Sequence, residues 1–255
     1  MKRPSTQSPS AYTSDLRRTE VRACELEDAH GCAERASARQ RQFVSDASHE
    51  LFTPVAAIRA RLEEARLHPE ETDLKDLLDR ALDDVDRLQA IIGDLLLLAR
   101  IDEGRPPVLR RLDLSHLIRS TVSQRVDRLP VRLRLSPRLM IDAVGDQLVC
   151  ALTNLLDNAQ RHAERVVTVE LHRDEGYAEL VVTDDGAGIA EADRERVFER
   201  FSRLDTARCR DKGGPGLGLA IVHGVAGACD GTIGLTKSET GGARFVLRLP
   251  LAEGV

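Results

Sequence analysis

The pattern that most limits what this chain can fold into is an apolar repeat between residues 74 and 99. Its members recur alternately four and three positions apart, which is the a and d pattern of a helix packed nearly parallel to a partner helix. The segment from about residue 41 to Leu67 also has a helical period, and His68-Pro69 begins a break between the two segments. We therefore predict a helical hairpin. Because one hairpin leaves part of its apolar surface uncovered, we expect two copies to form a dimeric four-helix bundle. The repeat consists of Leu74, Leu78, Ala81, Val85, Leu88, Ile92, Leu95 and Ala99.

Composition narrows the class of protein. With 255 residues, of which 42% are hydrophobic, the chain is long enough for one large or two modest cores. A formal net charge of −5 gives no reason to expect nucleic acid as a partner. Five cysteines without a CxxC pair suit a reducing compartment better than a disulfide framework. The sequence has no apolar run long enough to span a membrane, so we expect a soluble, cytoplasmic protein.

Changes of pattern along the chain predict its domains. Residues 1–40 form a lead-in that is disordered at its Ser- and Pro-rich start and becomes helical. The hairpin occupies 41–104, and the linker Gly104-Arg-Pro-Pro107 separates it from a domain of mixed strands and helices at 109–251. Helices and strands around one core indicate an α+β two-layer sandwich. We expect its helices at 113–126, 146–162 (capped by Asp146), 191–201 and 217–228, and its strands at 131–135, 166–171, 178–183, 232–237 and 243–249.

His49 is the first candidate for chemistry. It lies between Ser48 and Glu50, and it falls off the apolar stripe of its helix, so its imidazole should face outward. A neighbouring carboxylate can orient one ring nitrogen and raise the reactivity of the other, which makes a nucleophile. The alternative is an ordinary surface histidine. Pro54, five residues later, should kink the helix or loosen one turn.

A polar face on the predicted helix 146–162 is the second candidate. Asn158 lies four residues after Asn154, and Arg161 and His162 lie three and four residues after Asn158, so all four share one side. Amide oxygens are hard ligands that suit Mg²⁺, and arginine suits phosphate. By itself this pattern favours an ordinary polar helix face over a binding site.

Two glycine-containing segments follow. In Asp184-Asp-Gly-Ala-Gly188, an aspartate at a strand end can accept a hydrogen bond from an exocyclic amine such as that of adenine. The glycines allow close approach of the backbone, although a tight turn would explain them too. In Gly213-Gly-Pro-Gly216-Leu-Gly218, glycines open a helix whose free N–H groups suit phosphates. A third segment, Gly241 to Phe245, is interpreted as a hairpin turn.

Taken in order, these segments resemble a known family. Ser48 to Pro54 is similar to a phosphoacceptor box, Asn154 to His162 to an N box, and Phe198 to Phe201 to a phenylalanine box. Asp184 to Gly188 and Gly214 to Gly218 are similar to two glycine boxes. Over about residues 40 to 250 the chain resembles the cytoplasmic core of a two-component sensor histidine kinase, with a HisKA-type phosphotransfer hairpin and a Bergerat-type, HATPase_c-type ATP-binding domain.

The resemblance implies roles for residues of the hairpin. His49 would be the phosphoacceptor that attacks the γ-phosphate of ATP, and Glu50 would orient and deprotonate it. Thr53 matches the position that aligns water for dephosphorylation of the response regulator. The resemblance thus implies both a kinase and a regulator phosphatase. It also implies a homodimer through residues 41–104 and a cognate response regulator as partners.

The resemblance also implies an ATP and Mg²⁺ site. Asn158 would hold Mg²⁺, Asp184 would read adenine, and about residues 202–215 would form a lid over the phosphates. The nucleotide-binding residues that it implies are Asn154, Asn158, Arg161, His162, Asp184, Gly186, Gly188, Ile189, Phe201, Gly214, Gly216, Leu217 and Gly218.

Two residues depart from the family pattern, and two other classes of protein compete with the kinase. Phe52 stands where the family usually has arginine, and Asp185 where it often has asparagine. The competitors are a dimeric adaptor that holds ATP but signals by docking, and an ATPase of the topoisomerase or chaperone type with the same sandwich. Input would come from a partner chain, from residues 1–42, or from a missing or separate sensor segment, which would also be the only connection to a membrane.

Overall fold

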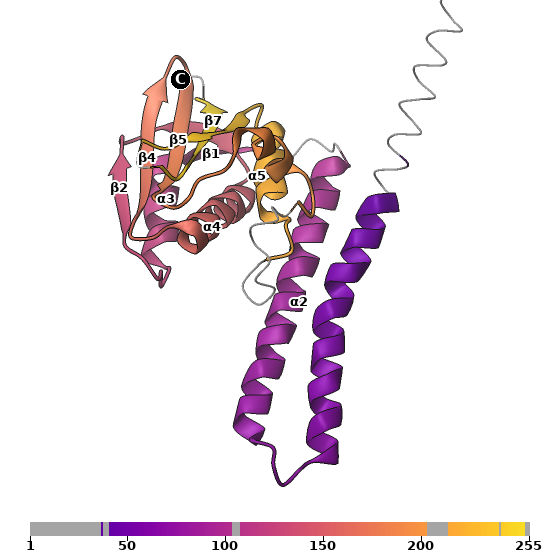
Figure 1. Cartoon of the computed structure of the whole chain (residues 1–255). Coiled ribbons are helices and arrows are strands. Elements are labelled where there is room, and N and C mark those ends of the chain that lie inside the picture. The colour runs from indigo at the N-terminus through magenta and orange to yellow at the C-terminus, as the bar shows by residue number, and fades with distance from the viewer. Residues whose placement is uncertain (1–36, 38–40, 104–107, 203–213, 240, 253–255) are drawn as a thin grey trace, which may run out of the picture. The chain divides into compact units, whose positions relative to one another are not determined.

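The computed structural model describes residues 37, 41–103, 108–202, 214–239 and 241–252. A helix runs unbroken from residue 41 to 67, with Pro54 buried within it. After a short turn, α2 (Leu74–Asp102) begins at Asp73, whose side chain accepts hydrogen bonds from the backbone N–H groups of Lys75 and Asp76. Figure 1 shows the two helices as a hairpin, which confirms that prediction.

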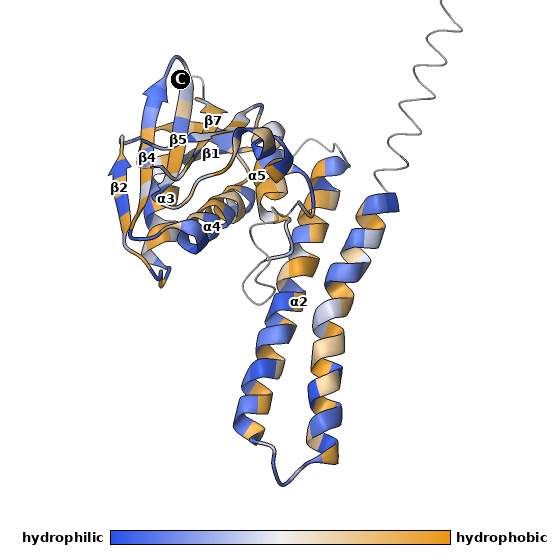
Figure 2. Ribbon diagram, in the orientation of Figure 1, coloured by the Kyte–Doolittle hydropathy of each residue, from blue (hydrophilic) through white to orange (hydrophobic). Residues whose placement is uncertain are grey.

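The apolar surface of α2 forms two stripes. Ile91 and Leu98, seven residues apart, are each only 1% exposed, and Leu77 and Asp84 continue this line as half-buried positions. Asp84 pairs with Arg61 of the preceding helix. The predicted repeat lies beside this line, and five of its members, Leu74, Leu78, Val85, Ile92 and Ala99, remain exposed. Figure 2 shows apolar residues along α2 on more than one side. The repeat is therefore not the most buried line of the hairpin.

The second domain is built on a five-stranded sheet with strand order β2-β4-β5-β7-β6. β2 and β4 are parallel, and the other neighbours are antiparallel. The strands alternate, so that one face is apolar and packs against helices. The strands are β2 (Val131–Leu135), β4 (Val167–Asp174), β5 (Tyr177–Asp184), β6 (Thr232–Lys237) and β7 (Ala243–Pro250).

Three helices cover that face: α3 (Leu114–Ser123), α4 (Gly145–His162) and α5 (Gly218–Ala228). Leu152, Leu155 and Leu156 of α4 and Phe245 of β7 are at most 1% exposed in the core between the two layers. The α+β two-layer sandwich that the sequence predicts is confirmed (Figure 1).

The structure corrects several expected elements. The short strands β1 (Arg110–Asp113) and β3 (Met140–Ala143), which pair with each other, were missed. The helix expected at 191–201 is wrong: two single 3₁₀ turns, η1 (Glu191–Asp193) and η2 (Arg196–Phe198), lie there. Asp146 does not cap α4, because Val144 holds that position and Asp146 is in the first turn.

Some expectations fall on other parts of the chain. Nearly all of the lead-in at 1–40 and most of the lid at 202–215 lie outside the described residues. Among the helices that are described, none is both long enough and apolar enough to cross a bilayer.

Candidate functional site

Asn154 is oriented by its own helix. Its Nδ2 donates to the carbonyl oxygen of Cys150, one turn earlier on α4, at 3.1 Å. This leaves its Oδ1 directed at Gly218, the first residue of α5, where a Cβ atom would overlap that oxygen. The absence of a side chain at Gly218 therefore allows the polar face of α4 to meet the N-terminus of α5 closely, where unpaired N–H groups are available to an anion.

Asp184 is the most buried polar group of this region. It ends β5 and is 2% exposed. Its Oδ1 accepts hydrogen bonds from the N–H groups of Gly186, at 3.0 Å, and Ala243, at 3.1 Å. Its Oδ2 is buried and has no hydrogen-bond partner among the described residues. A buried acceptor without a donor is costly, so this oxygen suits a ligand that brings an N–H group.

Close backbone contacts surround Asp184. A Cβ atom at Gly186 would overlap the carbonyl oxygen of His162 at the end of α4. Gly188 has a φ of +73°, and a Cβ atom there would lie 2.7 Å from the carbonyl oxygen of Gly241. A Cβ atom at Gly242 would overlap the carbonyl oxygen of Asp184 itself. Gly242 and the N–H of Ala243 thus belong to the site, although the sequence suggested only a hairpin turn; the paired glycines before the last strand were the available signal.

The second glycine segment meets the phenylalanine box. Gly216 has a φ of +77°, and a Cβ atom there would lie 2.9 Å from the carbonyl carbon of Phe201. Phe201 itself has a positive φ of 58°. A Cβ atom at Gly214 would be 3.6 Å from Nη2 of Arg161, so this segment lies beside the polar face of α4. Leu217 is fully buried in the core and supports the segment from beneath, whereas Ile189 is partly exposed at the margin of the core.

The ionisable groups of the site are shifted in definite directions. Partial burial and the neighbouring Arg161 lower the pKa of the His162 imidazole, while Asp184 acts in the opposite sense. The pKa of Asp185 is lowered, chiefly because the backbone N–H of Arg165 donates to its carboxylate. Both shifts favour a neutral His162 beside a charged Asp185 near neutral pH.

For a metal ion, this part of the structure offers few protein ligands. No group of three or more His, Cys, Asp or Glu side chains comes together among the described residues. The amide of Asn158, half-buried on α4, offers one oxygen ligand on the polar face. This fits Mg²⁺, which usually takes one or two protein ligands and completes its shell with water and substrate phosphates.

The family comparisons agree with this geometry. Residues 39–104 match the family model of the His Kinase A (phospho-acceptor) domain, and residues 143–253 match that of the histidine kinase-, DNA gyrase B- and HSP90-like ATPase. The chain is 41% identical over 218 residues to the probable sensor histidine kinase TcrY of Mycobacterium tuberculosis, covering 83% of this chain and 46% of that protein. It is 30% identical to the solved mycobacterial sensor histidine kinase MprB (TM-score 0.50), covering 58% of this chain and all of that one.

The chain belongs to the sensor histidine kinase family. A further solved structure, that of full-length ShkA in complex with AMPPNP, is 25% identical, with a TM-score of 0.60 over 82% of this chain and 46% of that one. The chain spans about half the length of the curated relatives it matches.

The segment around His49, within the part of the chain that matches the phospho-acceptor domain model, is helical. His49 and Thr53 are exposed and Glu50 is half-buried, all within the helix of residues 41–67. Ser48 donates its Oγ–H to the carbonyl oxygen of Val44 at 2.7 Å, one turn earlier. Phe52, in the place of the usual arginine, is 72% exposed.

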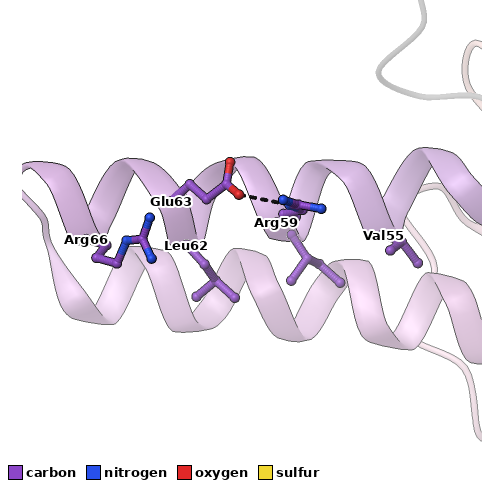
Figure 3. A pocket seen from close by; sticks show the side chains of 6 residues that line it. Val55, Arg59, Leu62, Glu63 and Arg66 are labelled. Carbon is purple, nitrogen blue, oxygen red and sulfur yellow. Dashed lines mark hydrogen bonds and ion pairs between the residues drawn. The ribbon is translucent and has the colours of Figure 1, made fainter.

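A shallow apolar groove lies farther along the same helix (Figure 3). Val55, Ile58 and Leu62 form its floor, and Arg59, Glu63 and Arg66 border it. Arg59 Nε and Glu63 Oε1 are 2.8 Å apart, so these two charges satisfy each other beside the groove. Val55 and Leu62 are exposed, which leaves an apolar surface open on this helix.

Proposed function

We propose that this chain is an ATP-dependent protein-histidine kinase that phosphorylates its own His49 and passes the phosphoryl group to an aspartate of a response regulator. The observation that carries the proposal is the buried, unpartnered Oδ2 of Asp184 beside the polar face of α4. This oxygen can accept a hydrogen bond from an amine of a ligand. The rest of the site is built from amides, an arginine and close backbone turns.

ATP fits this site with its adenine at Asp184 and its phosphates toward α4 and α5. The exocyclic amine of adenine donates to Oδ2 of Asp184, and Gly186, Gly188 and Ile189 line the base pocket. The phosphates extend toward Asn154 and Arg161 and toward the N-terminus of α5. Positive charge and free N–H groups there favour an anion. The relative ShkA was solved in complex with AMPPNP, which supports a nucleotide as the ligand.

Phosphoryl transfer needs a nucleophile and a proton acceptor. A ring nitrogen of His49 forms a bond to the γ-phosphorus, the bond from that phosphorus to the β–γ bridging oxygen breaks, and ADP leaves with the electron pair. Glu50 orients the ring and takes its proton. Asn158 would hold Mg²⁺, which would supply positive charge to the phosphates.

The match to the phospho-acceptor domain separates the kinase from its competitors. The ATPase family description also covers gyrase- and HSP90-like proteins, so that domain alone does not distinguish them. The matched residues 39–104 contain His49, which neither of those ATPases nor an adaptor requires.

The exposed apolar surface supports a homodimer through residues 41–104. Leu74, Leu78, Val85 and Ile92 of α2 and the groove at Val55 and Leu62 are open in a single chain. A second hairpin would cover them and complete a four-helix bundle. Light scattering should give twice the chain mass for the wild type, and Leu78→Glu should shift it toward the monomer. A monomeric wild type would contradict the bundle.

Thr53 supports a second activity, dephosphorylation of the regulator. It is exposed and lies four residues after His49, one helical turn along the same face. Thr53→Ala should keep autophosphorylation and slow the loss of phosphate from a phosphorylated regulator. Equal rates with and without the hydroxyl would refute this role.

The kinase itself is tested by incubating the purified chain with γ-labelled ATP and Mg²⁺. We expect label that is stable in base and lost in acid, absent from His49→Gln and Asn158→Ala. His68→Gln, which removes an exposed histidine from the turn of the hairpin, is the matched control and should label normally. Nucleotide binding without any label in the wild type would favour the adaptor.

A further inference from the structure

The carboxylate of Asp185 gathers three backbone N–H groups. Its Oδ1 accepts from Glu164 at 2.9 Å, from Arg165 at 3.0 Å and from Val166 at 3.4 Å. These three residues form the turn that connects α4 to β4. The side chain of Asp185 is only 7% exposed, although two of the donating residues, Glu164 and Arg165, lie at the surface.

Asp185 lies in the chain between residues that form two sides of the site, the end of β5 and the end of α4. The preceding residue, Asp184, has the unpartnered oxygen, and the following residue, Gly186, lies against the carbonyl oxygen of His162. The turn that Asp185 holds begins two residues after His162. Asp185 therefore fastens the end of β5 to the end of α4, the last turn of which contains Asn158 and Arg161.

The backbone N–H groups, and not an ion pair, make this connection. Nε of Arg165 is 3.4 Å from Oδ2 of Asp185, but the arginine side chain is 84% exposed. Solvent screening leaves such a pair little energy. Hydrogen bonds from N–H groups to a carboxylate are charge-assisted and are stronger than those between neutral groups.

We propose that Asp185 is a positioning residue for the nucleotide site, which it shapes by holding the turn after α4 against the end of β5. This rests on the proposed function, because it assumes that ATP binds between Asp184 and α4. Asp185 touches neither base nor phosphate in this role. Its loss should weaken the binding of every nucleotide and leave the transfer step at saturating ATP unchanged.

Four variants test the proposal in the full chain. Asp185→Ala removes the acceptor, Asp185→Asn keeps one acceptor oxygen, and Arg165→Ala removes only the ion pair. Asp142→Asn is the matched control, because Asp142 pairs with Arg111 in another part of the same domain. Each variant is assayed for binding of a fluorescent ATP analogue and of ADP, for KM and kcat of autophosphorylation, and for Tm.

We expect about tenfold weaker binding of both nucleotides to Asp185→Ala, or about 1.4 kcal/mol, because the turn after α4 is no longer held in place. Its KM should rise by a similar factor with kcat unchanged, and Asp185→Asn should lie between it and the wild type. Arg165→Ala and Asp142→Asn should bind normally.

Two results would overturn the proposal while leaving the proposed function in place. One is normal nucleotide affinity in Asp185→Ala with only Tm lowered, which indicates a purely structural role. The other is an equal loss in Arg165→Ala, which assigns the effect to the ion pair. If Asp185→Ala fails to fold, the other two variants decide. The proposal is refuted if Asp185→Asn binds nucleotide normally while Arg165→Ala loses nucleotide affinity. A wild type that binds no nucleotide would overturn both.

Discussion

Gly242 offers the sharpest test of how the adenine site is built. In Gly242→Ala, the new Cβ atom would overlap the carbonyl oxygen of Asp184, with its Oδ1 at 2.5 Å and its carbonyl carbon at 2.6 Å. Two of these atoms belong to the backbone of a central strand, and the third is held by two N–H groups, so no flexible side-chain end can move aside.

The magnitude follows from two contributions. Overpacking a tight site costs about 1–3 kcal/mol. Relief of the overlap would also displace Oδ1 from the N–H groups of Gly186 and Ala243, each worth about 1 kcal/mol net. We expect a loss of about 3 kcal/mol in the free energy of unfolding, and because Asp184 moves, at least tenfold weaker ATP binding, or about 1.4 kcal/mol.

Urea unfolding followed by circular dichroism measures the stability, and titration of a fluorescent ATP analogue measures the affinity. Gly234→Ala on β6 is the matched control, because no atom lies within 4 Å of its Cβ position. There the substitution should be neutral or stabilise by about 0.5–1 kcal/mol. Wild-type stability and affinity in Gly242→Ala would refute the close contact with Asp184.

Three further predictions concern single side chains. Asp184→Asn should lose the preference for ATP over inosine triphosphate, which lacks the exocyclic amine; an unchanged ratio of the two affinities would refute base reading. Gln160→Leu should lower the free energy of unfolding by about 2 kcal/mol in urea, because its amide bonds both N–H and C=O of Leu129 at 2.9 Å; an unchanged midpoint would contradict this. Burial raises the pKa of Asp94 from 3.8 to about 6, so its ionisation destabilises the folded state as pH rises through this range. Asp94→Asn should therefore raise Tm at pH 7.5 and leave it unchanged below pH 3.8, and a gain at both pH values would contradict the assignment.

Local periodicity was enough to predict the polar face of α4. Asn154, Asn158 and Arg161 share a side because of helical spacing alone, and the strand predicted at 178–183 falls one residue short of β5 at each end. Gly242 and the N–H of Ala243 could not be placed in the same way. They reach Asp184 only because β7 pairs with β5, a contact between residues far apart in the sequence.

Tertiary context also decided the elements that were predicted incorrectly. Residues 191–198 have helix-favouring composition, yet they form two 3₁₀ turns beside the phenylalanine box. On α2 the period identified an apolar stripe, but periodicity cannot tell which of two stripes is covered in the folded chain. Ile91 and Leu98 are the most buried, and the predicted repeat at Leu74 and Leu78 is left for another surface.

The two adjacent aspartates at the end of β5 have different roles. Strand alternation turns Asp184 inward, where one oxygen is satisfied by the backbone and the other is left for a ligand. Asp185, one residue later, turns to the opposite side and uses its carboxylate on the turn after α4. The two residues should therefore fail differently. Loss of the Asp184 carboxylate changes which base is preferred. Loss of Asp185 weakens the binding of all nucleotides alike, because it displaces the turn after α4 and leaves the contact between Asp184 and the base unchanged.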